Sequence, residues 1–96
     1  MMILVTYDVN TQTSESRKRL RHVAKICKNH GQRVQNSVFE CLVDPAQWIM
    51  LREKLITTIN TKEDSLRFYF LGSNWKRRVE HVGAKEAYDP EGPFVI

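Results

Sequence analysis

The stretch Met2–Tyr7 reads MILVTY, a run of aliphatic, β-branched and aromatic side chains with no charged residue. Because both alternating faces of this run are apolar, it is typical of a central strand with neighbours on both sides. Asp8 ends the run, and the polar residues 10–14 indicate a loop.

A helix is expected next, starting at Thr13 or Ser14, with Glu15 in its electropositive first turn. Four small or apolar side chains recur at the i, i+3, i+4 and i+7 spacing of one buried helix face. They are Leu20, Val23, Ala24 and Cys27. Gly31 is expected to end this helix as a left-handed cap.

The segment Arg33–Val43 has a strand-like composition, but Asn36–Ser37 is a turn signal within it. Two short strands on either side of that turn are therefore expected. Asp44 and Pro45 are typical of a helix start, with Gln47 at the third helical position, and this second helix should run to about Ile59. Its apolar face is expected to be formed by Trp48, Leu51 or Arg52, Leu55 and Ile59.

Two further strands are predicted, at Ser65–Leu71 and at Val79–Val82. The order strand, helix, two strands, helix, strand is that of the α+β class, a ferredoxin-like βαββαβ sandwich, here with an extra C-terminal strand. We expect residues 1–83 to form this domain. Residues 84–96 should form an extended tail that pairs with the partner subunit of a homodimer; the alternative is that the tail folds back on its own sheet.

Length and composition are consistent with one ordinary domain. The chain has 96 residues, 42% of them hydrophobic, and that length accommodates one hydrophobic core. The longest apolar run is too short to cross a bilayer and lacks the basic start of a signal peptide, so a cytoplasmic protein without membrane association is expected. Cys27 and Cys41 are too few for a disulfide scaffold and are expected to be reduced core residues.

Positive charge is concentrated in the first third of the chain. Residues 1–34 hold seven basic and two acidic residues, a net charge of +5, whereas the remainder carries −1. This asymmetry indicates a polyanionic partner. Lysines and arginines recur at helical spacing beside the apolar face of the first helix and could follow a row of phosphates, although a merely solvated face is the alternative. They are Lys18, Arg21, Lys25 and Lys28.

A second basic cluster, Lys76, Arg77 and Arg78, follows Trp75. The tryptophan could stack on a base or, alternatively, pack in the core or an interface. Asp8 is the most informative acidic residue, because a carboxylate directly after a central strand can ligate a hard cation such as Mg²⁺. The alternative is that Asp8 caps the following loop or helix. One carboxylate makes a poor metal site, but a two-fold axis near Asp8 would bring two together.

Five stretches together resemble a known family. They are VTYDVN (5–10), RKRLRHVAKICKNHGQRVQNSVFEC (17–41), SLRFYFLG (65–72), NWKRRVEHVG (74–83) and YDPEGP (88–93). In these stretches the chain resembles the small CRISPR-associated adaptation proteins, the Cas-two family, over nearly its whole length. The VEHVG ending and the acidic, proline-containing tail are similar to the branch found with type I-C systems.

The resemblance implies a homodimeric, metal-dependent endonuclease acting on double-stranded DNA or single-stranded RNA. It implies that Asp8 binds Mg²⁺ or Mn²⁺ jointly with the same residue of a second copy. It also implies a larger Cas-one integrase as a partner in spacer acquisition. Five residues match family positions in or around the cleft: Tyr7, Arg17, Arg19, Arg33 and Phe39. The resemblance implies that Tyr7 is a catalytic residue together with Asp8.

Two hypotheses follow. In the first, the protein hydrolyses phosphodiester bonds, with Asp8 as metal ligand and Arg17, Arg19 and Arg33 orienting phosphates. In the second, the protein is a non-catalytic, DNA-binding dimeric scaffold of the integration complex, and the basic residues carry its function.

Overall fold

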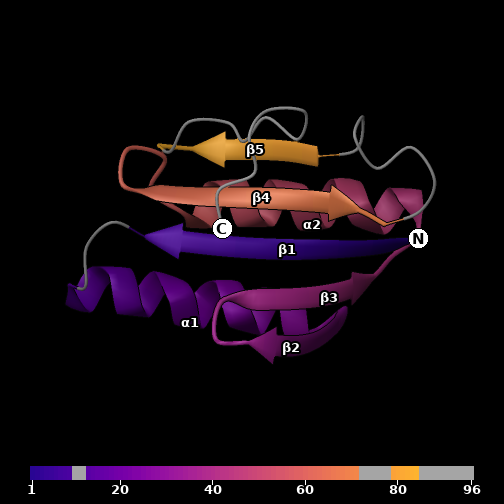
Figure 1. Cartoon of the computed structure of the whole chain (residues 1–96), viewed down its shortest axis with the longest axis horizontal. Helices are drawn as coiled ribbons and strands as arrows, with labels where there is room; N and C mark the ends of the chain where they lie inside the picture. Colours follow the sequence, from indigo (N-terminus) through magenta and orange to yellow (C-terminus); the bar gives the residue numbers. More distant parts are fainter. Residues whose placement is uncertain (10–12, 72–78, 85–96) are drawn as a thin grey trace, which may run out of the picture.

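A computed structural model describes residues 1–9, 13–71 and 79–84 of the chain (Figure 1). The elements are β1 (Met2–Val9), α1 (Ser14–Lys28), β2 (Gly31–Gln35), β3 (Val38–Leu42), α2 (Pro45–Thr58), β4 (Asp64–Phe70) and β5 (Val79–Gly83). The strands form one antiparallel sheet in the order β2-β3-β1-β4-β5. This confirms the predicted ferredoxin-like α+β fold with an extra strand after β4.

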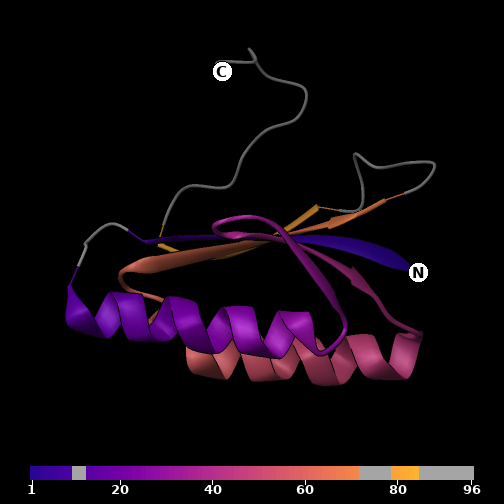
Figure 2. The same ribbon diagram turned by 90° about the horizontal axis from the view of Figure 1, so that it is seen from below.

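Both helices lie on the same side of the sheet, and no described element covers the other side (Figure 2). Strand β1 lies in the centre, paired with β3 and β4, as its composition predicted. Its residues Ile3, Val5 and Tyr7 are 0–2% exposed and point toward the helices. Because side chains alternate along a strand, Leu4, Thr6 and Asp8 face the uncovered side.

The helix starts follow the predicted capping chemistry. The Thr13 hydroxyl accepts a hydrogen bond from the backbone N–H of Ser16 at 3.0 Å. Asp44 and Gln47 form a reciprocal capping box, with Pro45 in the first turn of α2. The predicted helix faces are buried in the core against the large side chains of β3 and β4. The fully buried members of this core include Val23, Cys27, Phe39, Leu51, Leu55, Leu66 and Phe68.

The prediction that Gly31 caps the first helix was wrong. The helix ends at Lys28, Asn29 is its cap in a right-handed conformation, and Gly31 is the first residue of β2. A Cβ atom at Gly31 would lie 1.8 Å from the carbonyl oxygen of Glu40 on β3. Glycine is therefore required here because two backbones approach closely, and not because a helix turns back.

The predicted break at Asn36–Ser37 is confirmed as the turn between β2 and β3, with a register shift between Arg33 and Gln35. Trp48 packs edge-on against Phe68 and Phe70, at 4.9 and 5.0 Å between ring centroids. In the described part of the chain, no helix is both long enough and apolar enough to cross a membrane. The predicted tail, residues 84–96, lies outside the described residues except for Ala84.

Candidate active site

Asp8 is an exposed carboxylate near the end of the central strand, on the side of the sheet that the helices leave uncovered. A hollow of about 230 Å³ surrounds it. The lining side chains come from β1, β4 and β5, and all lie on the uncovered face: Thr6, Asp8, Ser65, Arg67, Tyr69 and His81. The strand pairing explains this grouping, since Asp8 is opposite Ser65 and Arg67 is opposite His81.

Only Asp8 among these six residues was predicted to be part of the site, and five were not: Thr6, Ser65, Arg67, Tyr69 and His81. Arg67 donates a hydrogen bond to the Tyr69 hydroxyl at 3.5 Å, and its other terminal nitrogen lies 3.3 Å from Nδ1 of His81. Nε2 of His81 is shielded from solvent and finds no hydrogen-bond partner in the described part of the chain. The alternation of Arg67 and Tyr69 with Phe68 along β4 was the only sequence signal that placed them on a shared face.

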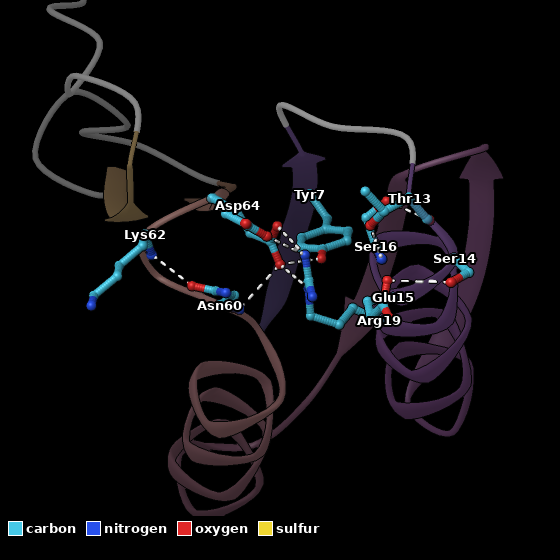
Figure 3. A network of polar contacts seen from close by, with 10 residues as sticks. Tyr7, Thr13, Ser14, Glu15, Ser16, Arg19, Asn60, Lys62 and Asp64 are labelled. Atoms are coloured by element: carbon cyan, nitrogen blue, oxygen red, sulfur yellow. Dashed lines mark hydrogen bonds and ion pairs between the residues drawn. The ribbon is translucent and has the colours of Figure 1, made fainter.

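Beneath Asp8, on the helix side of the sheet, lies a buried polar network (Figure 3). Asp64, 0% exposed, is its centre. The Tyr7 hydroxyl donates to Oδ2 of Asp64 at 2.5 Å, Nε of Arg19 donates to the same oxygen at 2.7 Å, and the backbone N–H of Asn60 donates to it at 3.1 Å. Nη2 of Arg19 also reaches Oδ1 of Asp64 at 3.2 Å and Glu63 at 3.0 Å. The network thus joins β1, α1 and the start of β4.

The network changes the acid–base properties of its members. Burial, together with the hydrogen bond to Asp64, raises the pKa of Tyr7 well above its usual range. The hydrogen bond to Asp64 raises the pKa of Arg19 as well, against the opposing effect of burial. Tyr7 therefore stays protonated and Arg19 stays charged at any physiological pH. Asp64, the first residue of β4, is the residue that holds both.

The predicted site residues do not all lie together. Tyr7 follows the strand alternation and points away from Asp8, toward the helices. Arg19 is bound to Asp64 and Glu63, while Arg17 and Lys18 are exposed nearby on the first turns of α1. Phe39, expected to line the cleft, is 0% exposed within the core. In the single chain, these side chains are on the opposite side of the sheet from the carboxylate of Asp8.

The remaining predicted residues divide into two groups. Arg33 lies on β2, where its guanidinium carbon is 5.4 Å from the centroid of the Phe39 ring. It lines a second hollow with Arg21 and Lys25, at the far end of α1. Lys76, Arg77 and Arg78 lie outside the described residues, as does Trp75.

The side chains around Asp8 fit a hard divalent cation only in part. Carboxylate and hydroxyl oxygens from Asp8, Thr6 and Ser65 are the donor type that Mg²⁺ and Mn²⁺ take. However, no group of three His, Cys, Asp or Glu side chains comes together within residues 1–9, 13–71 and 79–84. A second carboxylate must come from elsewhere, and the exposed position of Asp8 allows a second copy to bring it.

Both cysteines are free and fully buried, at 0% exposure. The neighbouring Cys41 thiol and burial together raise the pKa of Cys27. The same contact lowers the pKa of Cys41, but both thiols are inaccessible, and an inaccessible thiol does not act as a nucleophile. Cys27 and Cys41 are therefore core residues, as predicted, and do not contribute to the site around Asp8.

Comparisons with known proteins agree with this architecture. The family described as CRISPR associated protein Cas2 matches residues 1–79. A CRISPR-associated endoribonuclease Cas2 from Chlorobaculum tepidum is 65% identical over the full length of both chains. A CRISPR-associated endonuclease Cas2 from Halalkalibacterium halodurans is 54% identical, again over both full lengths. The crystal structure of Streptococcus pyogenes Cas2 at pH 6.5 superposes with a TM-score of 0.73 at 63% identity, covering 86% of this chain and 100% of that one.

Proposed function

Because the chain belongs to the CRISPR-associated Cas2 family, we propose that it is an endonuclease that hydrolyses phosphodiester bonds and takes part in spacer acquisition. The observation that carries the proposal is the exposed Asp8 carboxylate in its hollow at the end of β1. One similar protein is named an endoribonuclease and another an endonuclease, so double-stranded DNA and single-stranded RNA are both candidate substrates. We also propose that the protein belongs to the type I-C branch, because its VEHVG ending and acidic tail are similar to that branch, and that it is cytoplasmic.

The proposed active form is a homodimer whose uncovered sheet faces meet. The face that carries Asp8 also carries apolar side chains: Leu42 is 64% exposed, and Leu4 and Val38 are only half-buried. Contact between two such faces would bury this apolar surface. A two-fold axis near the end of β1 would place the Asp8 residues of both copies side by side, which provides the second carboxylate that a single chain lacks.

In this dimer the two Asp8 carboxylates would hold Mg²⁺ or Mn²⁺. The cation would supply Lewis acidity to the scissile phosphate and to an attacking water. Arg67 projects into the same hollow and would balance the negative charge of the phosphate. Tyr7 acts indirectly, because its hydroxyl is bonded to Asp64 on the other side of the sheet and fixes the strand that carries Asp8.

The test is cleavage of labelled duplex DNA and single-stranded RNA by wild type and by Asp8→Asn, with Mg²⁺, Mn²⁺ or EDTA. Glu40→Gln is the matched control, because Glu40 is an acidic residue on the same face, opposite Leu4. The proposal requires metal-dependent cleavage that is lost in Asp8→Asn and kept in Glu40→Gln. Equal cleavage by Asp8→Asn and wild type, both folded, would place the activity elsewhere or in a contaminant.

A second candidate function is a non-catalytic, DNA-binding scaffold for the larger integrase subunit. It is favoured by the exposed basic side chains of α1, several of which form no ion pair within the described part of the chain. Charge reversal at Lys18, Arg21 and Lys25 would then abolish spacer acquisition, whereas Asp8→Ala would not. If cleavage is needed for spacer acquisition, the nuclease hypothesis predicts instead that Asp8→Ala abolishes acquisition.

A further inference from the structure

Two large polar side chains lie next to each other in the hollow around Asp8, on the side toward β5. Arg67 on β4 is paired directly with His81 on β5, and both line the hollow. The neighbouring row of paired residues holds Asp8, Ser65 and Gly83. Because serine is small and glycine has no side chain, Arg67 and His81 provide the polar wall of the hollow beyond Asp8.

The contact between these two side chains fixes the protonation of the imidazole. Nη2 of Arg67 lies 3.3 Å from Nδ1 of His81. A guanidinium has no acceptor atom and only donates hydrogen bonds. Nδ1 of His81 must therefore accept this bond, so the ring is the neutral tautomer that carries its proton on Nε2.

The other ring nitrogen of His81 offers no reason for a histidine at this position. Nε2 is shielded from solvent and has no hydrogen-bond partner in residues 1–9, 13–71 and 79–84. A buried donor without a partner destabilises the folded state, and an apolar side chain of similar size would avoid that cost. The feature that distinguishes histidine from such a side chain is the acceptor Nδ1, which holds Arg67.

The guanidinium of Arg67 is held from two directions. Nη1 donates to the Tyr69 hydroxyl at 3.5 Å, two residues along β4, and Nη2 makes the shorter contact to His81 on β5. Because a guanidinium is planar, contacts on two of its nitrogens fix its orientation as well as its position. A hydroxyl and a neutral imidazole orient the positive charge but do not neutralise it, unlike the carboxylate bound to Arg19.

We propose that His81 is a positioning residue of the nuclease site, whose Nδ1 holds the Arg67 guanidinium in the orientation in which it meets the scissile phosphate beside Asp8. The inference rests on the proposed function, because it takes the hollow around Asp8 as the place of cleavage. A positive charge that is already oriented stabilises the charge of the transition state without reorganising during the reaction. His81 acts through Arg67 and does not itself touch the substrate.

The first experiment measures metal-dependent cleavage of labelled duplex DNA and single-stranded RNA by His81→Asn and His81→Leu. The side-chain oxygen of asparagine lies near the position of Nδ1 and can accept from Arg67, whereas leucine is closer to imidazole in size but has no acceptor. A packing role makes leucine the better replacement, and a positioning role makes asparagine the better one. His22→Leu, on the exposed surface of α1, is the control.

His81→Leu should lower kcat by about 10- to 100-fold with little change in KM, because the displaced charge acts mainly in the transition state. His81→Asn and His22→Leu should cleave nearly as fast as wild type. The reverse order, with the leucine variant active and the asparagine variant impaired, overturns the proposal. Urea unfolding of each variant verifies that it is folded.

A double-mutant cycle with Arg67→Gln tests whether His81 acts through Arg67. Arg67→Gln should lower kcat at least as much as His81→Leu does, and combining the two substitutions should lower it little further. A further loss of about 10- to 100-fold in the double variant would show that His81 acts independently of Arg67, and the proposal would be wrong.

Nitrogen-15 NMR of the wild-type chain in EDTA tests the contact without any cleavage. We expect the proton of His81 on Nε2 and separate signals for the two terminal nitrogens of Arg67, because a held guanidinium does not rotate freely. A proton on Nδ1 or a freely rotating Arg67 overturns this inference alone if wild type still cleaves and Asp8→Asn does not. A wild-type protein that cleaves neither substrate with any metal removes the proposed function, and this inference with it.

Discussion

Replacing Tyr7 by Phe is expected to remove one hydrogen bond from the buried network and leave the rest of the core in place. The Tyr7 hydroxyl donates to Oδ2 of Asp64 at 2.5 Å, and Asp64 is 0% exposed. After the substitution, Arg19 and the backbone of Asn60 still donate to that carboxylate. The charge of Asp64 is therefore not left without partners.

The magnitude follows from this count of donors. A hydrogen bond to a charged group contributes about 1.5–3 kcal/mol. Because Asp64 keeps its other donors, Tyr7→Phe should lie at the low end, near 1.5 kcal/mol. Asp64→Ala removes the shared acceptor and leaves Tyr7 and Arg19 without it, so it should cost about 3–5 kcal/mol.

Urea unfolding at matched protein concentration measures both values. At an m-value of about 1–3 kcal/mol per M, Tyr7→Phe should lower the midpoint by roughly 1 M with m unchanged. Tyr69→Phe is the control, because it removes the same atom from β4, where the hydroxyl makes only a long hydrogen bond, 3.5 Å from Arg67. If Tyr7→Phe and Asp64→Ala both unfold like wild type, the network does not stabilise the strand. A Tyr7→Phe protein that folds normally but no longer cleaves would instead assign the hydroxyl a direct catalytic role.

Three further predictions concern pH, packing and surface charge. Burial raises the pKa of Tyr7 in the folded protein above the value of about 10 in the unfolded chain. The contribution of the Tyr7 hydroxyl to the free energy of unfolding is therefore complete below about pH 10. It is lost as the pH rises further, because the unfolded chain then binds fewer protons than the folded protein. The free energy of unfolding of wild type should therefore fall by up to about 1.4 kcal/mol per pH unit relative to Tyr7→Phe, as measured by urea unfolding between pH 9 and 11 or so. Gly31→Ala should destabilise the protein by about 1–3 kcal/mol or more, because the new Cβ meets the Glu40 carbonyl; faster amide exchange in β2 and β3 would locate the damage, and unchanged exchange would contradict it. Glu80→Gln should cost less than about 1 kcal/mol and progressively less at high salt, because its ion pair with Arg52 is one-third exposed; a salt-independent loss would contradict this.

The sequence predicted the fold well because its local signals agree with its tertiary structure. Thr13, Asp44 and Pro45 start helices where their chemistry indicates, and the turn at Asn36–Ser37 separates two strands. Gly31 was assigned wrongly because a glycine that caps a helix and a glycine required where two paired strands approach closely give the same sequence pattern. Only the position of the Glu40 carbonyl distinguishes them.

The site was predicted less completely, for a related reason. Asp8 was identifiable because it follows an apolar run directly, but the prediction that it lies after the strand was wrong, since β1 continues through Asp8 to Val9 and Asp8 pairs with Ser65 on β4. Asp64 was not, because an acidic residue at the end of a polar connection resembles any solvated loop residue until Tyr7 and Arg19 converge on it. His81 joins Asp8 only through the register of β4 and β5, a long-range pairing that no local pattern specifies.

The complete burial of Cys27 and Cys41 makes the native chain a ready background for site-directed labelling. Thiol-reactive probes modify accessible thiolates and leave fully buried thiols largely untouched. A single cysteine introduced for Leu42, on the uncovered face, would therefore carry a spin label or fluorophore without removing any native residue from the core. In a two-fold dimer, every such label has a symmetry mate, and the distance between the two labels can be measured by spectroscopy. Distances from several labelled positions would together locate the two-fold axis and show how the two sheets approach each other.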